Sequence, residues 1–575
     1  MASSLSSRLL PIGLKLGLAF FLFLIPALAQ SGSPKIAVDL QNLNPSQNVD
    51  VVVQYRVLPR PGLIPGLLRI VDGVLKLTLG LIDALVINLP VSRLGDLAAD
   101  PNVLYISPDR RVGPALDNAG PAVAAEVARS YGFTGRGIGV AVLDTGITAG
   151  KDLQAPTGLL GLALPRIAYS ESFVGGSPAD GNGHGTHIAG IAGGNGTQST
   201  GAGYSKTFTG IAPKVHFINL RVLDEQARSS DSVVIRAIER AVALRSLLNI
   251  RVMNLSLGRP VMESYRTDPL CRAVEAAWKA GIVVVVSAGN SGRNDSFNNN
   301  GYGTITSPGN DPYVITVGAM KAMGTPSRGD DQIASYSSKG PTAIDHIVKP
   351  DIVAPGNRVI SVRAAGTSVQ SANSVPRSYY ASSGSGASSD YVMLSGTSMS
   401  AGVVSGAVAL LLDKDPRLTP DQVKARLMKT AHKNFPSYSI ATDPLTGQTY
   451  RSQYDIFTIG AGYLDIAAAL ASGDVSSGKA LSPPAYRKRN GQTFVLTSQS
   501  ALWDETSMRG ESALWGETGP WSQSNVWGSA VTHSGSGAST SGSSALWGES
   551  ALWGESALWG ESALWGESLR IYGER

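Results

Sequence analysis

Residues 268–290 read DPLCRAVEAAWKAGIVVVVSAGN, and this stretch places a helical pattern directly before a strand pattern. In its first half, apolar residues recur three and four positions apart, which is the period of an amphipathic helix. Its second half is an unbroken Ile/Val run, apolar at both parities, as in strands that are covered on both faces. The stretch therefore predicts one helix–strand unit of an α/β sheet.

Similar patterns recur on both sides of this stretch. The strand-like runs are GIGVAVLD (137–144), VHFINLRVLD (215–224), IRVMNLSLG (250–258) and YVITVGAM (313–320), and a further helical pattern is SVVIRAIERAVALRS (232–246). Alternation of strands and helices favours an open, mostly parallel sheet with helices on both faces. We expect this α/β domain to span residues 116–472.

A small α+β domain is expected before it, in residues 30–115. The segment contains the strand pattern VDVVVQYRV (49–57) and a very apolar middle, residues 63–89, which four charged residues interrupt: Arg69, Asp72, Lys76 and Asp83. Charges at this spacing argue for a packed domain and against a membrane span.

Residues 1–29 have the pattern of a signal peptide. Arg8 and Lys15 precede an apolar run at 16–25, and Ala27-Leu28-Ala29 matches the small-x-small pattern of a cleavage site. The apolar run is far shorter than the ~20 residues that a membrane span requires. We therefore expect a secreted protein, extracellular or in the cell envelope.

Charge and cysteine content argue against a nucleic-acid-binding protein and against a protein stabilised by internal disulfides. The formal net charge of +5 is small for 575 residues, and no Lys/Arg cluster is interleaved with aromatic residues, so a nucleic-acid partner is not expected. Cys271 is the only cysteine, so the chain forms no internal disulfide. Its place in a helical pattern favours a packed structural thiol.

The C-terminal part changes composition abruptly. Residues 473–499 resemble a linker, with Pro483-Pro484 and a basic triplet at 487–489. Eight of the nine tryptophans follow residue 500, and SALWGE hexads run four times in register over residues 544–567. The tail at 500–575 is either an expanded low-complexity segment or a repeat that binds a cell surface.

Three segments each carry one side chain of a type used in nucleophilic catalysis. Asp144 ends the apolar strand pattern, at the carboxyl edge where open α/β sheets bind ligands. His184 lies among glycines before an apolar helix, and Ser398 precedes a helix that is apolar all round. Taken singly, Asp144 is typical of a turn or helix cap, His184 of a structural histidine and Ser398 of a helix cap.

The order Asp, His, Ser is one of those known for the serine-hydrolase triad. VAVLDTGI (140–147), GHGTHIAG (183–190) and SGTSMS (395–400) resemble the three signature segments of the subtilase family, over residues 116–472. The family's order also holds for GIAP, NLSLG, SAGN, KPDIVAPG and GAGYLDIAAAL. The resemblance implies a serine endopeptidase that acts on proteins or peptides and requires no cofactor for its chemistry.

The same resemblance implies roles for individual residues. Ser398 is the nucleophile, His184 its base and Asp144 the group that orients the imidazole. The Asn290 side chain and the Ser398 backbone N–H would form the oxyanion hole. Read alone, Asn290 also fits a turn in its Asn-Ser-Gly context. His187, the second histidine of its motif, is expected to be structural.

Substrate contacts follow from the resemblance as well. Ser256, Leu257 and Gly258 resemble the strand that pairs with the substrate backbone, and Pro308 resembles a proline beside the specificity pocket. Thr306 falls at the pocket floor, where many relatives have glycine, so a shallower pocket is expected.

The chain departs from the family pattern near the nucleophile. Gly402 stands where a proline is usual and Ser400 where alanine is usual. These changes put the rigidity of the helix start in doubt and remove no catalytic group. An insert at 362–389, rich in serine and glycine, is expected to be a surface loop.

The N-terminal segment resembles the family's inhibitory propeptide, most specifically at DPNVLYISPD (100–109). It would act as an intramolecular inhibitor that the enzyme removes itself, between about 113 and 122. Relatives often bind structural calcium, for which DLQAPTG (152–158) or Asp330-Asp331 could supply oxygens. No segment matches a calcium loop, so the metal ligands stay unknown.

Two rival hypotheses belong to non-enzyme classes. An inactive binding protein with a subtilase fold would have no reason to keep Asp144, His184, Ser398 and Asn290 together. An adhesion protein built on the hexads would explain only residues 500–575.

Overall fold

The computed structural model divides into two compact units, Met1–Val112 and Gly113–Arg575, close to the expected boundary at 115. The expected signal peptide and most of the hexads lie outside the described residues. These are 35–36, 40, 43–79, 83–108, 119–155, 166–295, 299–367, 374–443, 447–487, 493–495, 532–534, 537–540 and 564–565.

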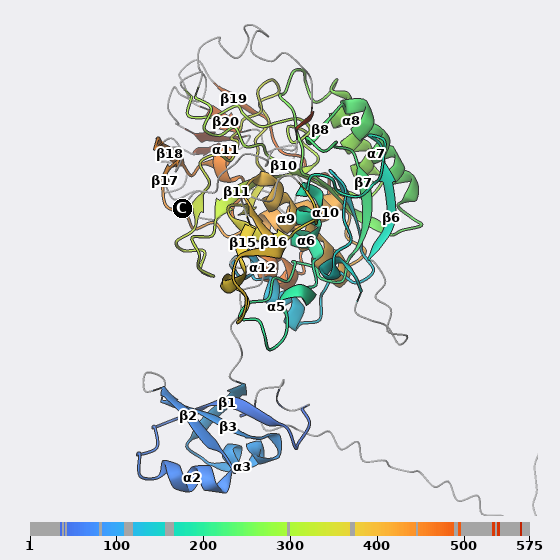
Figure 1. The fold of residues 1–575 in the computed structure, drawn as a ribbon. Coiled ribbons are helices and arrows are strands. Elements are labelled where there is room, and N and C mark those ends of the chain that lie inside the picture. Colours follow the sequence, from blue (N-terminus) through green and yellow to red (C-terminus); the bar gives the residue numbers. More distant parts are fainter. Residues whose placement is uncertain are drawn as a thin grey trace, which may run out of the picture. The chain divides into compact units, whose positions relative to one another are not determined.

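The first unit is a small α+β domain, as expected (Figure 1). Its antiparallel sheet has the strand order β2-β3-β1-β4. Val51, Val53 and Tyr55 alternate along β1 and point into a core that α2 and α3 also supply. The elements are β1 (Asn48–Tyr55), α2 (Ile64–Ile70), β2 (Val74–Leu79), β3 (Ala84–Pro90), α3 (Leu94–Ala99) and β4 (Val103–Pro108).

The second unit is built on an eight-stranded sheet with the order β12-β11-β10-β9-β5-β7-β6, and β13 pairs with β11. All of its pairings are parallel except that of β12. The strands are β5 (Gly139–Asp144), β6 (Ile167–Ser172), β7 (His216–Arg221), β9 (Ile250–Leu255), β10 (Val283–Ser287), β11 (Ile315–Lys321), β12 (Gln332–Ile333) and β13 (Ile352–Pro355). The predicted α/β class is therefore confirmed.

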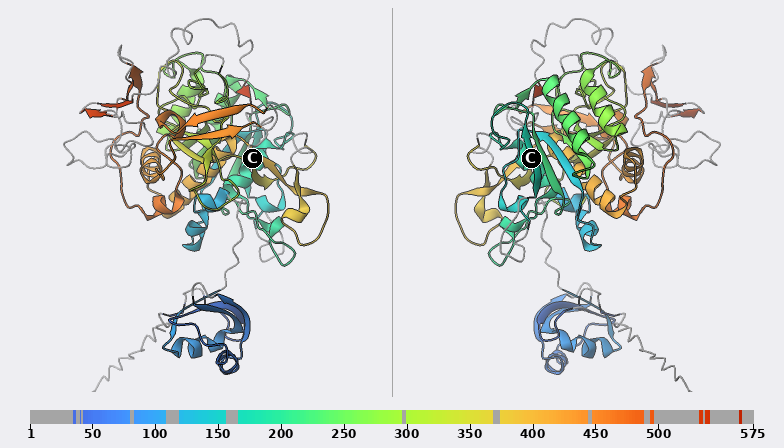
Figure 2. Two further views of the ribbon diagram at one scale, coloured as in Figure 1. Left: turned by 90° about the vertical axis from the view of Figure 1, so that its left-hand side faces the viewer. Right: turned by 90° about the vertical axis from the view of Figure 1, so that its right-hand side faces the viewer.

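Helices cover both faces of this sheet, and β5, β10 and β11 are consequently buried at every position. α7 and α8 lie side by side on one face, while α6 and α9 pack together on the other (Figure 2). The helices are α4 (Ala119–Ala122), α5 (Ala125–Ser130), α6 (His184–Gly193), α7 (Asp231–Leu244), α8 (Pro269–Lys279), α9 (Thr397–Lys414), α10 (Pro420–Thr430), α11 (Ile456–Ile459) and α12 (Ile466–Ala471).

The opening stretch of the sequence shows how local chemistry sets these elements. The Asp268 carboxylate accepts the Leu270 N–H at 2.9 Å and so caps α8, while Pro269 occupies the first turn. The Cys271 thiol is fully buried within this helix, as a packed structural thiol should be.

The insert at 362–389 forms more structure than its composition predicts. β15 (Ser374–Pro376) and β16 (Ala387–Leu394) join β14 (Val359–Val362) in a three-stranded sheet. Tyr380 and Tyr391 are fully buried against Phe208, with ring centroids 5.4 and 4.7 Å from it. With Ile360, Val375 and Ala381 these rings form a small separate core, to which the Ser/Gly-rich insert contributes Val375, Tyr380 and Ala381.

Residues 473–499 were expected to form a linker, but the first part of this segment packs on the α/β domain. The Ser482 hydroxyl donates to the Asp351 carboxylate at 2.5 Å and accepts from Lys424 Nζ at 2.9 Å, all in the core. Lys349 Nζ donates to the same carboxylate at 2.7 Å. The buried charges therefore need Ser482, and the domain's packing extends beyond residue 472 to at least Ala485.

This contact predicts different stabilities for two truncated chains. A chain ending at Gly473 should lose about 3 kcal/mol or more of unfolding free energy, because Asp351 and Lys424 lose a buried partner. A chain ending at Arg487 keeps these contacts and should unfold like the full-length protein. Thermal and denaturant unfolding, with Ser398→Ala in each chain to prevent self-digestion, measures the difference. Equal midpoints for the two truncations would contradict the assignment of residues 474–485 to the domain.

Short strands occur in the C-terminal part. β19 (Ala485–Arg487), β20 (Thr493–Val495), β22 (Gly537–Thr540) and β21 (Thr532–Ser534) pair in that order, and β23 (Leu564–Trp565) pairs with β8 (Arg228–Ser229). Among the described residues, no helix has the length and apolar character to cross a membrane.

Candidate active site

Asp144 stands at the carboxyl end of β5, a central strand of the large sheet. The N–H groups of Val222 and Leu223 both donate to its backbone carbonyl, which ties the strand end to the next segment. Its Oδ1 accepts the Thr145 N–H at 2.7 Å. The carboxylate is completely buried, so its direction is set by these contacts and not by solvent.

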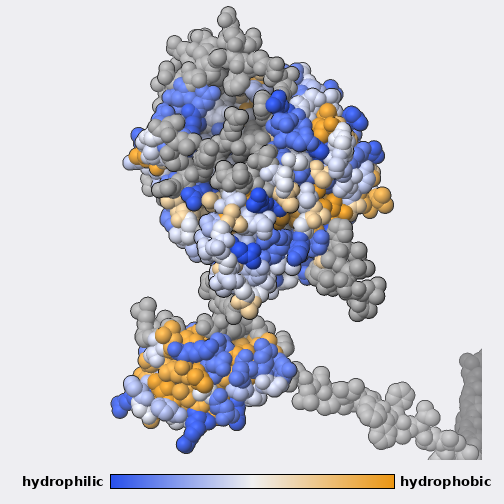
Figure 3. Space-filling view, viewed as in Figure 1, coloured by the Kyte–Doolittle hydropathy of each residue, from blue (hydrophilic) through white to orange (hydrophobic). Residues whose placement is uncertain are grey.

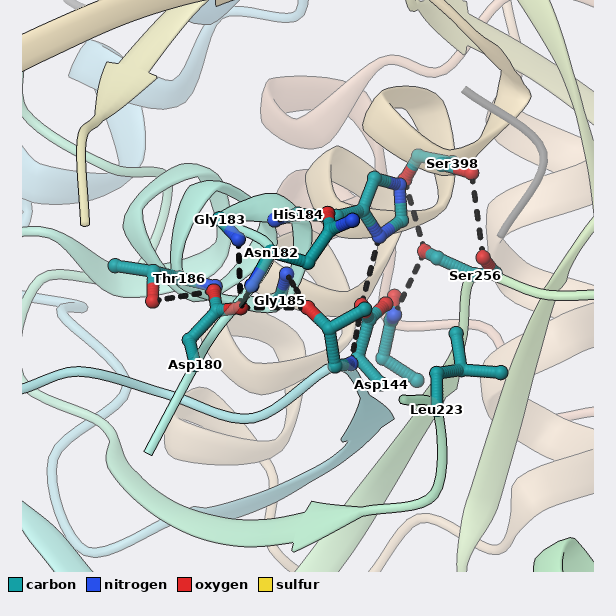
Figure 4. A network of polar contacts seen from close by, with 12 residues as sticks. Asp144, Asp180, Asn182, Gly183, His184, Gly185, Thr186, Leu223, Ser256 and Ser398 are labelled. Atoms are coloured by element: carbon teal, nitrogen blue, oxygen red, sulfur yellow. Dashed lines mark hydrogen bonds and ion pairs between the residues drawn. The ribbon is translucent and has the colours of Figure 1, made fainter. Parts of the chain in front are cut away.

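His184 begins α6 and faces this carboxylate (Figure 4). Its Nδ1 lies 2.7 Å from Asp144 Oδ1, and both side chains have an exposed fraction of zero. A carboxylate only accepts hydrogen bonds, so Nδ1 carries the hydrogen and Nε2 is the basic atom of the neutral ring.

Gly185 permits this approach. A Cβ at position 185 would lie 2.2 Å from the Gly146 carbonyl oxygen and 3.1 Å from Asp144 Cβ. Any larger residue would push α6 away from β5, which explains why glycine follows the histidine.

Asp180 is not among the residues that the sequence motifs predict, yet it ties the Asp144 and His184 segments together (Figure 4). Its carboxylate accepts five hydrogen bonds: from the Thr145 hydroxyl, the N–H groups of Asn182 and Gly183, and both the N–H and hydroxyl of Thr186. The signal in the sequence was an aspartate before a glycine-rich turn, since such carboxylates accept from backbone N–H groups two and three residues ahead.

Ser398 is the second residue of α9, a helix buried along nearly its whole length. The helix start places the positive end of its dipole beside this residue. In Figure 4 the Ser398 hydroxyl points away from the His184 imidazole and toward the Ser256 carbonyl, to which it donates at 3.4 Å. Proton transfer to His184 therefore requires the hydroxyl hydrogen to turn away from that carbonyl.

Asn290 follows β10 and meets the residue before Ser398. Its Oδ1 accepts the Thr397 N–H at 2.9 Å and the Thr397 hydroxyl at 3.2 Å. Because the amide is planar, these bonds direct Nδ2 away from Thr397. The structure thus brings Asn290 to the start of α9 from 107 residues away in sequence.

The expected substrate segments lie beside each other. Ser256, Leu257 and Gly258 follow β9, and Arg259 exchanges backbone hydrogen bonds with Ser307 at 3.0 and 2.8 Å. Thr306 donates its backbone N–H to Ala288, two residues before Asn290, and its side chain is nearly buried. One edge of the site thus gathers the predicted strand and the predicted pocket residue.

The two departures from the family pattern have local explanations. A Cβ at Gly402 would lie 3.2 Å from Ile191 Cγ2, so glycine lets α9 approach α6 closely. The Ser400 hydroxyl is buried but donates to the Ala354 carbonyl at 3.0 Å, which satisfies it.

His187 is structural by its contacts. Its Nε2 lies 3.1 and 3.2 Å from the carbonyl oxygens of Val359 and Val392. Burial, and secondarily the nearby His184, lowers the pKa of His187 to about 3, so the ring is neutral and Nε2–H donates.

This lowered pKa predicts acid destabilisation. The unfolded chain binds a proton at His187 near the ordinary value of 6.5 while the folded chain does not until about pH 3. The contribution of His187 to the free energy of unfolding is therefore fully present above pH 6.5. It falls by about 1.4 kcal/mol for each pH unit below that value. Denaturant unfolding at pH 7, 6 and 5 should show a slope that His187→Gln reduces by this amount. Equal slopes for the wild type and His187→Gln would show that His187 does not cause the acid destabilisation.

Two of the acidic residues suggested for calcium, Asp152 and Asp331, are poorly suited to bind it. Asp152 Oδ1 accepts the Gln198 N–H at 2.7 Å and Oδ2 accepts the Tyr391 hydroxyl at 2.6 Å, so protein donors occupy both oxygens. Burial raises the pKa of Asp331 to about 7, which leaves only part of its charge at neutral pH. Within the described ranges, no three His, Cys, Asp or Glu side chains gather as metal ligands would.

Comparison with known proteins agrees with this geometry. A family model described as "Subtilase family" matches residues 135–460. The chain is 38% identical to serine protease AprX of Bacillus subtilis (strain 168) over 339 residues, 58% of this chain and 70% of the relative. It is 33% identical to subtilisin DY of Bacillus licheniformis over 314 residues, 54% of this chain and 89% of the relative.

The match covers the strands and helices that carry Asp144, His184 and Asn290, and it includes Ser398 at the start of α9. A similar likeness, 30% identity over 355 residues, holds for subtilisin E of Bacillus subtilis (strain 168), covering 61% of this chain and 76% of the relative. The fold, the order of the three residues and these relatives lead to one conclusion: the chain belongs to the subtilase family and is a serine-type endopeptidase.

Proposed function

We propose that this protein is a secreted endopeptidase that cuts protein substrates through an acyl-enzyme on Ser398 and is made as a self-processing precursor. The observation that carries the proposal is the 2.7 Å contact between His184 Nδ1 and the buried Asp144 carboxylate. This contact leaves Nε2 as the base, on the side where α9 presents Ser398.

The first chemical step is attack of Ser398 on the peptide carbonyl. His184 Nε2 takes the hydroxyl proton while Oγ forms a bond to the carbonyl carbon. Asp144 stabilises the imidazolium, and because it accepts only, it keeps the ring in the reactive tautomer. The Asp180 hydrogen bonds hold the Asp144 and His184 segments at this distance.

Charge then develops on the substrate oxygen. Asn290 Nδ2 and the Ser398 backbone N–H are the donors proposed to receive it, the latter reinforced by the helix dipole. The imidazolium gives its proton to the leaving amine as the C–N bond breaks, which leaves the acyl-enzyme. Water then attacks the ester carbon while His184 takes its proton, and His184 returns that proton to Ser398 Oγ as the C–O bond breaks.

Substrate binding is proposed along Ser256–Gly258. A strand end that offers backbone groups favours extended peptides, which bind by adding a strand. Thr306 places a hydroxyl and a methyl group where glycine would leave space, so we expect a shallow pocket that prefers smaller side chains.

The first unit is proposed to be an inhibitory propeptide, spanning residues 30–115. It exposes apolar side chains on two strands: Val74 and Leu77 of β2 are 63% and 55% exposed, and Leu104 of β4 is 44% exposed. Figure 3 shows apolar residues gathered on this unit. A small domain rarely leaves such a surface uncovered unless it docks on a partner, and the peptidase domain of the same chain is the occupant we propose.

Secretion rests on residues 1–29, and removal of the propeptide is expected between 113 and 122. The tail at 500–575, with SALWGE hexads over residues 544–567, is proposed to be an expanded low-complexity segment, with attachment to a cell surface as the alternative.

A serine-reactive fluorophosphonate tests the proposed chemistry. Treatment should abolish casein hydrolysis and place a single label on the peptide that contains Ser398. Hydrolysis that persists in the fully labelled protein would refute the acyl-enzyme. A purified mature protein with neither label nor hydrolysis would indicate an inactive binding protein.

A further inference from the structure

A row of buried polar side chains runs from the interior of α9 back to the nucleophile. The Ser405 hydroxyl donates to Asn254 Oδ1 at 2.9 Å, and Asn254 Nδ2 donates to the Ser256 hydroxyl at 2.9 Å. The Ser256 hydroxyl donates in turn to the Ser398 backbone carbonyl at 3.0 Å. All four residues have an exposed fraction of zero.

This row is unusual for its surroundings. From Ala401 to Leu412, α9 is otherwise lined with glycine, valine, alanine and leucine, and alanine would fit the helix at position 405 without any polar group to satisfy. A buried hydroxyl or amide is costly unless it is hydrogen-bonded, and here each group has its partner in the next one. Three polar residues that are hydrogen-bonded in series therefore indicate a function at Ser398, where the row ends.

That end is the backbone of Ser398. In an α-helix the Ser398 carbonyl already accepts the N–H of Gly402, so the Ser256 hydroxyl is a second donor to the same oxygen. Gly402, the sixth residue of α9, leaves the backbone after the first turn freer than the proline that is usual in the family. A second donor compensates by holding the turn that presents both the Ser398 hydroxyl and its N–H.

We propose that Ser405, Asn254 and Ser256, together the Ser405 relay, are positioning residues that fix the Ser398 backbone for oxyanion binding. The proposal rests on the proposed role of Ser398 as nucleophile. Ser405 reaches the reacting atoms only through the other two, and the Ser256 carbonyl holds the resting Ser398 hydroxyl at the same point.

The test uses Ser405→Ala in the full chain, far from any substrate contact. Without the Ser405 hydroxyl, Asn254 Oδ1 loses its donor and the amide no longer holds the Ser256 hydroxyl in one direction. We expect kcat to fall about fivefold to tenfold, the worth of one such hydrogen bond, with KM unchanged, because the oxyanion forms only in the transition state.

Ser400→Ala is the matched control. Ser400 lies on the same helix, is equally buried and donates to Ala354, outside the relay. Its kcat should stay within about twofold of the wild type. The proposal would be overturned if Ser405→Ala lowered kcat no more than this control does, or if it raised KM and left kcat unchanged.

A double-mutant cycle separates positioning from general stability. If the residues act in series, Ser405→Ala should cost almost nothing further in a Ser256→Ala background. Losses that multiply would mean independent effects and would also overturn the relay. Because wild-type activity and Ser398→Ala report on the nucleophile itself, failure of the relay is distinguishable from failure of the proposed function.

Discussion

Replacing Ser398 with alanine should leave a folded precursor that has lost about 10⁶-fold in turnover. The loss is large because the hydroxyl is the proposed nucleophile, and neither Asn290 nor His184 can act on a peptide bond without it. Folding should survive, since the one hydrogen bond that the hydroxyl donates, to the Ser256 carbonyl, is a long 3.4 Å. Casein hydrolysis and thermal unfolding of the two proteins measure both effects.

The same variant tests self-processing. Ser398→Ala protein made in a protease-free host should retain its N-terminal segment beyond residue 30, while the wild type should begin between 113 and 122. N-terminal sequencing reports which peptide bond is cut. Wild-type casein hydrolysis by the variant would refute the triad, and trimming of the variant between 113 and 122 would show that another enzyme performs the processing.

Replacing Asp144 with asparagine should lower kcat by about 10⁴-fold at nearly unchanged KM. An asparagine of the same shape presents either an N–H or a carbonyl to His184 Nδ1, and the N–H holds the imidazole with its hydrogen on Nε2. That tautomer cannot accept the Ser398 proton. Neither form carries the charge that stabilises the imidazolium.

Asp224→Asn is the matched control for this change. Asp224 lies in the segment that follows β7 and accepts the N–H groups of Gln226 and Arg228, but no hydrogen bond joins it to His184. Steady-state kinetics should separate the two variants by about 10³-fold or more. If Asp144→Asn stayed within tenfold of Asp224→Asn, Asp144 would not orient the imidazole.

The large sheet was predictable because its signal is local and strong. Isoleucine and valine at both parities, as in 282–286, can bury in only one common way: in a strand covered on both faces. The insert at 362–389 was not predictable, because serines and glycines dominate its composition, while its few core residues, such as Tyr380, pack against residues outside it, such as Phe208 and Tyr391. Ser482 was hidden in the same way, since one hydroxyl in a Pro/Ser segment gives no sign of the buried Asp351 it meets.

The candidate site likewise has a part that the sequence predicts and a part that it does not. From the sequence alone, Asp144, His184 and Ser398 are predicted to carry the chemistry, because they lie, in this order, in three segments that resemble the signatures of the subtilase family. Only the tertiary structure decided how they are held. The hydrogen bonds that join Asp180 to Thr145, Thr397 to Asn290 and Ser405 to Asn254 link residues 35, 107 and 151 positions apart. Periodicity and motifs report on neighbours along the chain, whereas a hydrogen bond between two buried side chains depends on how strands and helices pack, and no local pattern records that.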